Sequence, residues 1–110
     1  MAYTSATLRI ALEVPGVYGF KLWLFDTTDV TADVDTSAYI SDAVKKGMNK
    51  GDLILRRTWT SLPTRATGMQ TAAGSAPVLA SGGFHWVLGI TSAGAADVTD
   101  VTALAVTNTD

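Results

Sequence analysis

The chain has 110 residues, a length that fits one domain. Apolar residues make up 47 % of it and charged residues 16 %, and the formal net charge is −2. This balance argues against binding to nucleic acid or to an anionic membrane. The absence of Cys excludes disulfides and thiolate metal sites. The chain has no run of 18 apolar residues, so no membrane span is expected.

Two strands are expected near the N-terminus. The opening MAYTSATLRIALEV lacks a basic start followed by an apolar run, so no signal peptide is expected. Within it, residues 7–14 alternate apolar and polar side chains, as a half-buried strand does. A Pro- and Gly-containing turn over 15–19 leads into FKLWLF, residues 20–25. That strand is apolar on both faces except at Lys21, so we expect it to be central or covered.

A short helix is expected over about residues 37–48, after an acidic loop at 26–37. Side chains that can cap its start are Asp35, Thr36 and Ser37. Its apolar stripe consists of Tyr39, Ile40, Ala43, Val44 and Met48. Gly47 and Gly51 end the helical region, and the sequence KGD makes a tight corner into a third strand, 53–59.

The second half of the chain begins with a segment that has no periodicity, residues 60–77. It is long for a connection inside a compact domain, so we interpret it as an extended loop. Residues 78–91 suggest a hairpin that turns at Gly82 and Gly83, and residues 97–108 suggest a closing strand.

These patterns predict an all-β fold, a small β-barrel or β-sandwich of about six strands with one short helix. The domain is expected to span 1–110, with an extended N-terminal arm (1–6) and the long loop 60–77. The side chains expected to be largely buried on the alternating strands are Leu22, Leu24, Leu53, Leu55 and Trp86.

Few side chains suggest catalysis. His85 is the only histidine, and a catalytic histidine needs an orienting acid and a reacting group within reach. We therefore expect His85 to be a strand residue on the outer face, with no catalytic residues and no cofactor in the chain.

Two binding alternatives remain open. The loop acids Asp26, Asp29, Asp33 and Asp35 offer oxygen ligands for a hard cation, but their spacing does not fit a calcium loop, and local turn hydrogen bonds are the simpler interpretation. The aromatic side chains of Trp23, Trp59 and Trp86 suit either a sugar-stacking platform or packing in a core or subunit interface.

Four short motifs resemble small bacteriophage virion proteins. They are FKLWLFDTTDVTADV, AYISDA, MNKGDLI and ITSAGAADVTDVTALAV, which together cover roughly residues 20–55 and 84–106. The resemblance is to capsid decoration proteins and the base modules of head fibres, and the insertion 60–77 departs from it. It implies a non-enzymatic cement protein, made in the bacterial host cytoplasm, that sits on the capsid surface of the virion.

The expected partners are the major capsid protein and further copies of the chain, with a homo-trimer favoured. Low charge and a strand that is apolar on both faces also motivate self-association. Contacts with other chains are expected from the N-terminal residues and from four residues of the long loop, namely Leu62, Pro63, Arg65 and Met69. The alternatives are a carbohydrate-binding adhesion module of a virion and a tail or connector component.

Overall fold

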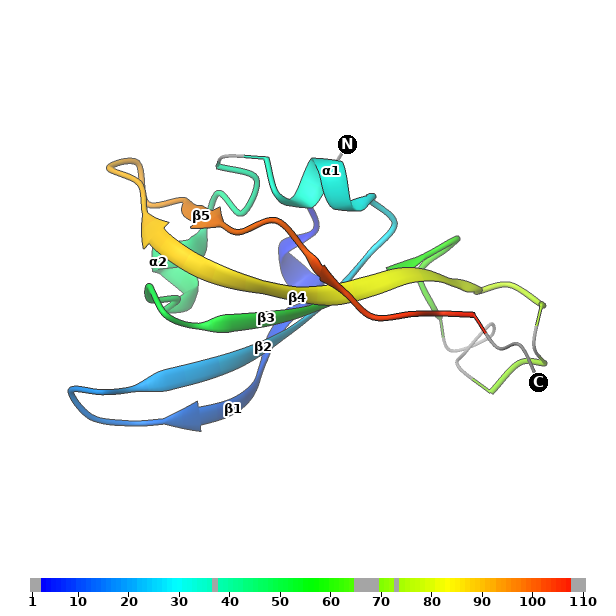
Figure 1. The fold of residues 1–110 in the computed structure, drawn as a ribbon, viewed down its shortest axis with the longest axis horizontal. Helices are drawn as coiled ribbons and strands as arrows, with labels where there is room; N and C mark the ends of the chain where they lie inside the picture. The colour runs from blue at the N-terminus through cyan, green and yellow to red at the C-terminus, as the bar shows by residue number, and fades with distance from the viewer. Residues whose placement is uncertain (1–2, 37, 65–69, 73, 108–110) are drawn as a thin grey trace.

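The computed structural model describes residues 3–36, 38–64, 70–72 and 74–107, and six strands of this part of the chain form one sheet. The strands are β1 (Leu8–Val14), β2 (Phe20–Thr27), β3 (Leu53–Trp59), β4 (Leu79–Ile90), β5 (Ala96–Val98) and β6 (Thr102–Ala103). Two one-turn helices, α1 (Thr31–Val34) and α2 (Ala43–Lys46), and a 3₁₀ turn at Ser5–Thr7 complete the elements. The predicted all-β class with about six strands is confirmed (Figure 1).

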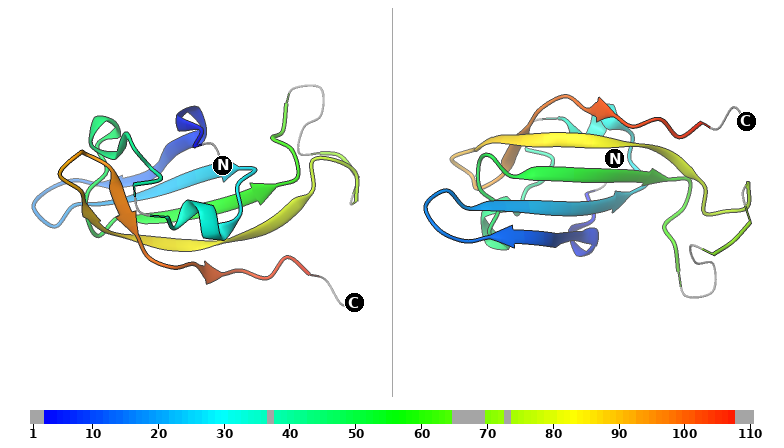
Figure 2. Two further views of the ribbon diagram at one scale, coloured as in Figure 1. Left: turned by 90° about the horizontal axis from the view of Figure 1, so that it is seen from above. Right: turned by 60° about the horizontal axis from the view of Figure 1, so that its bottom comes forward.

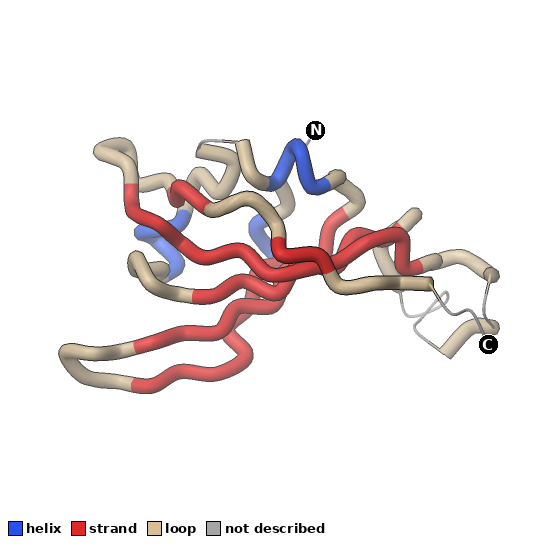
Figure 3. The backbone as a smooth tube through the Cα atoms, viewed as in Figure 1, coloured by secondary structure: helices blue, strands red, loops and turns tan. Residues whose placement is uncertain are grey.

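The sheet has the order β1-β2-β3-β4-β5, and β6 pairs with β4. All pairs are antiparallel except β2 and β3, which run parallel. A parallel pair requires a crossover, and residues 28–52 supply it with α1 and α2. Both helices lie on the same side of the sheet (Figure 3), so the crossover covers one face and leaves the other open.

The covered side, here called the inner face, carries the core. Its strand side chains include Trp23, Ile54, Val87 and the fully buried Phe25. These side chains pack against buried residues of the crossover and of the C-terminal segment, namely Val34, Tyr39, Ile40, Ala43, Met48, Ala96 and Val98.

The predicted core was therefore on the wrong side of the sheet. Leu22, Leu24, Leu53 and Leu55 are half-buried, and Trp86 is 52 % exposed. Because β2 is apolar on both faces, its alternation could not show which face the crossover would cover.

The helix is much shorter than expected. It begins after Asp42 and ends at Gly47, whose φ of 89° is the left-handed conformation that glycine accepts readily. Tyr39, Ile40 and Met48 are buried as expected although they lie outside the helix, whereas Val44 is exposed. Of the expected capping residues, Ser37 lies outside the described residues, and α1 occupies part of the segment expected to be a loop.

The predicted hairpin at 78–91 is wrong, because β4 runs through both of its glycines without a turn. A Cβ on Gly83 would lie 2.4 Å from Thr102 O, and one on Gly82 would lie 3.0 Å from Arg56 O. These glycines permit close approach of neighbouring backbone. The predicted closing strand is likewise divided, with β5 and β6 separated by residues 99–101.

Asp52 fixes the corner that leads from the crossover into β3. Its side chain is buried and accepts hydrogen bonds from Trp23 Nε1 at 3.1 Å, Asn49 N at 2.9 Å and Lys21 N at 3.2 Å. The backbone of Asp52 also accepts from Val87 N at 2.8 Å. The KGD corner expected from the sequence thus ties β2, β3 and β4 together.

The N-terminal segment, expected to be an extended arm, is described from Tyr3 onward and lies against its own domain there. The Tyr3 hydroxyl donates to Asp42 Oδ1 at 2.6 Å, and its ring lies 5.8 Å from Phe25 and 5.5 Å from Tyr39. Ser5 also hydrogen-bonds to Asp42. These contacts anchor the start of β1 to the loop before α2.

Candidate interaction surface

The open side of the sheet, here called the outer face, is lined by apolar side chains in register across four strands. The central row consists of Leu12, Leu22, Leu53 and Trp86. The adjacent row places Leu24, Leu55 and Phe84 between Arg9 on β1 and Thr102 on β6. In the second view of Figure 2, β1 to β4 lie in front of α1 and α2. The outer face is therefore a continuous apolar surface.

The side chains at the flanks of this surface are the most exposed. On β1 and β4, Leu12, Val14, Trp86 and Leu88 are each about half exposed or more. Soluble monomers rarely expose large contiguous apolar patches, and such patches commonly mark interaction sites.

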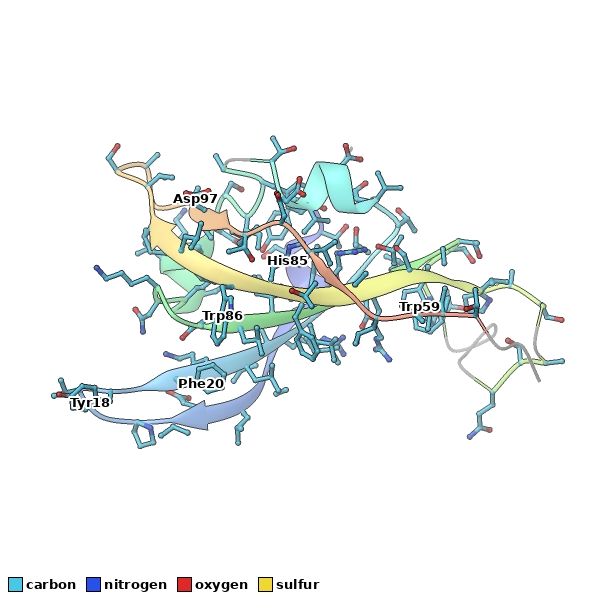
Figure 4. The ribbon with its side chains drawn as sticks, viewed as in Figure 1. Tyr18, Phe20, Trp59, His85, Trp86 and Asp97 are labelled. Atoms are coloured by element: carbon cyan, nitrogen blue, oxygen red, sulfur yellow. The ribbon has the colours of Figure 1, made fainter. Side chains whose placement is uncertain are left out.

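The β1–β2 hairpin extends the apolar surface beyond the sheet. Its tip carries Val17 and Tyr18, which are 97 % and 96 % exposed. Figure 4 shows Tyr18 at the hairpin tip, with Phe20 and Trp86 toward the same end of the sheet. Two large apolar side chains that touch almost nothing in their own chain suit a contact with another molecule.

On β1 to β4, the charged side chains of the described outer face lie at the end opposite the hairpin tip. Asp26 accepts hydrogen bonds from Arg57 at 2.6 and 2.9 Å and from Trp59 Nε1 at 2.9 Å, and it also pairs with Arg9. Burial acts to raise the pKa of Asp26, but the Arg57 and Trp59 hydrogen bonds and the charges of Arg57 and Arg9 lower it overall. This cluster, Asp26–Arg9–Arg57–Trp59, forms a polar border to the apolar rows.

A hollow of about 240 Å³ lies beside this cluster. Two of the predicted contact residues, Leu62 and Pro63, line it together with Ala6, Thr7, Arg9 and Asp26. The other two, Arg65 and Met69, lie outside the described residues. The structure thus brings the start of the long loop and the N-terminal segment together at the end of the sheet opposite the hairpin tip (Figure 1).

His85 lies on the inner face and is fully buried, so its predicted outer position is wrong. Its Nδ1 lies 2.8 Å from Thr99 O, and its Nε2 accepts a hydrogen bond from Arg56 Nε at 3.2 Å. Burial lowers the pKa of His85 and the charge of Arg56 adds to this, while the hydrogen bond to Thr99 opposes it. The ring is a neutral link between β3, β4 and the segment after β5.

Two of the four loop acids have side-chain partners from other parts of the fold. Asp26 belongs to the polar cluster, and Asp29 accepts a hydrogen bond from the Tyr39 hydroxyl. Among the residues that the structure describes, no three His, Cys, Asp or Glu side chains gather as a metal site would require. The three tryptophans do not form one platform, because Trp23 is buried on the inner face while Trp86 is exposed on the outer face.

The chain matches no family model, no curated protein and no solved structure in the three comparisons made. In the part of the chain that the structure describes, no helix is long and apolar enough to cross a membrane.

Sequence reasoning missed the outer face as a surface because it assigned those side chains to the core. One signal was present, since residues 20–25 are apolar on both faces and a single crossover covers only one of them. The exposed hairpin tip carried no comparable signal, because turn residues often include an isolated apolar side chain.

Proposed function

We propose that the protein is a non-enzymatic structural component of a bacteriophage virion, a decoration or cement protein that binds the outer capsid surface and stabilises it or anchors a fibre. The observation that carries this proposal is the uncovered apolar outer face. A chain that closes only one side of its sheet is suited to working in contact with other protein surfaces. The motif resemblance to virion proteins supplies the finer assignment.

The capsid contact is proposed at the long-loop end, where Leu62 and Pro63 meet the N-terminal segment. Small apolar anchors beside Arg9 and Asp26 suit a protein surface that offers both apolar groups and hydrogen-bond partners. Arg65 and Met69 belong to the same loop and are proposed to join this contact.

A carbohydrate-binding adhesion module is the second candidate, favoured by the exposure of Trp86. Sugar sites combine an aromatic platform with several convergent polar groups. The neighbours of Trp86 in the central row are leucines, so the outer face suits an apolar protein contact better. A tail or connector component would use the same surfaces against a different virion protein.

Deletion of residues 62–76 tests the capsid contact. Thr60 N donates to Val78 O at 2.9 Å, and Val78 N donates to Thr60 Oγ1 at 3.0 Å, so the loop ends already lie together. A short Gly-containing turn can join them without disturbing β3 or β4. We expect the variant to fold while its affinity for capsids of the encoding phage falls by at least about tenfold in cosedimentation.

The matched control is Val44→Glu, which alters an exposed apolar residue of α2 far from the loop and should bind as the unaltered chain does. Normal capsid binding by the deletion variant would show that the loop is not the contact. Failure of the unaltered chain to bind capsids, together with glycan binding, would favour the adhesion module.

A further inference from the structure

We propose that a second copy of this chain covers the outer face, so that two sheets pack face to face in a two-fold dimer. The proposal deepens the assembly role above by naming the occupant of the apolar surface. It rests on the shape and the charge of the described outer face and on the exposed area of the whole chain.

The shape suits sheet-on-sheet packing. Two sheets that pack through their apolar faces form a sandwich with a layer spacing of about 10 Å. The rows centred on Leu22, Leu53 and Leu55 supply the middle of such a layer, and Trp86 and Leu12 supply its flanks. Because the chain's own crossover covers the inner face, the outer face is the one that lacks a second layer.

The charge permits self-contact. A two-fold contact brings the same patch from both copies together, so an unbalanced charge in the patch would repel itself. The strand residues of the two apolar rows include one charged side chain, Arg9, at the border. That arginine is paired with Asp26. Asp26 is shared with Arg57, so like charge is confined to this border and the remaining side chains of the two rows are uncharged.

The chain exposes more surface than a compact monomer of its mass. The chain exposes 6732 Å², whereas a compact monomer of this mass exposes about 5,800 Å². The excess over the whole chain is about 900 Å², which is comparable to the area of about 800 Å² that one partner of a standard interface buries. The hairpin tip, with Val17 and Tyr18, adds contact area at one end of the face.

The test is sedimentation equilibrium of the full chain over a micromolar concentration series. The unaltered chain should show twice the 11.5 kDa of one copy. The double variant Leu12→Glu with Trp86→Glu should weaken the dimer by at least about a hundredfold, because each carboxylate would be buried without a partner. Both positions are more than half exposed in the single chain, so the variant should keep its circular dichroism spectrum.

Val44→Glu is the control, since it adds one carboxylate at an exposed apolar position on the covered side and should dimerise normally. The proposal would be overturned if the unaltered chain were a monomer, or if it were a trimer such as the resemblance implies. It would also be overturned if the double variant dimerised as tightly as the unaltered chain. Capsid cosedimentation is scored separately. A monomer that binds capsids would overturn the dimer alone, and a dimer that does not bind would overturn the capsid role alone.

Discussion

Asp52→Ala is expected to lower the free energy of unfolding by about 3–6 kcal/mol. The buried side chain accepts hydrogen bonds from Trp23 Nε1, Asn49 N and Lys21 N, and alanine would leave these three donors without their acceptor. The stranded Trp23 donor is buried and costs about 1–3 kcal/mol, and the two backbone donors, which are only part-buried, each cost an amount near the lower end of that range. Because small domains are stable by only about 5–15 kcal/mol, this single change removes a large part of the total.

Urea denaturation followed by circular dichroism measures the Asp52 effect. Asp97→Ala is the matched control, because Asp97 is an exposed aspartate of β5 (Figure 4) and its loss should change stability by less than about 0.5 kcal/mol. A loss below about 1 kcal/mol for Asp52→Ala would show that the corner does not depend on this side chain.

Phe25→Ala should cost about 3–5 kcal/mol, whereas Phe20→Ala should cost about 1 kcal/mol. The two phenylalanines lie on the same strand but face opposite sides of the sheet. Phe25 is fully buried, with its ring 5.8 Å from that of Tyr3 and 6.1 Å from that of Tyr39, so alanine would open a cavity. Phe20 is half-buried at the hairpin end of the outer face.

Thermal and urea unfolding of both variants, below the concentration at which the chain associates, gives the comparison. Each phenylalanine variant serves as the control for the other, since strand and residue type are the same. Equal losses would mean that both faces of β2 are covered within one chain, and the outer face would then not be free for a partner.

Strand positions were predictable because alternation is a local property. Residues 7–14, 20–25 and 53–59 became β1, β2 and β3 with bounds close to those expected. Which face of the sheet is buried depends instead on the path of the crossover, a tertiary property that the alternation of β2 cannot report. For this reason Trp86, expected in the core, is exposed, and His85, expected on the outer face, is buried.

Glycine and helix signals failed for a related cause. Gly82 and Gly83 were interpreted as a turn, yet β4 passes through them because neighbouring backbone approaches too closely for a side chain. Four of the five residues in the stripe from Tyr39 to Met48 are buried, with Val44 the exception, but burial in an irregular crossover does not require a helix. In both places the local backbone geometry was predicted incorrectly.

The candidate surface was predictable only in part. Leu62 and Pro63 were expected to make contacts from the loop, and the structure places them beside the hollow at the sheet end. The outer face could be recognised only after the crossover was seen to cover the opposite side. Its leucines have the same sequence signature as core leucines, since burial by a neighbouring chain and burial within one chain select the same side chains.

The central claim is that the chain closes the inner face of its sheet itself and leaves the outer face open for other chains. Thiol labelling at two adjacent positions of β4 tests it most directly, because the natural chain has no Cys. In a dilute solution Trp86→Cys, at a position 52 % exposed, should react at least about tenfold faster than Val87→Cys, at a position 1 % exposed. Equal protection of the two thiols in the dilute, folded chain would contradict the claim.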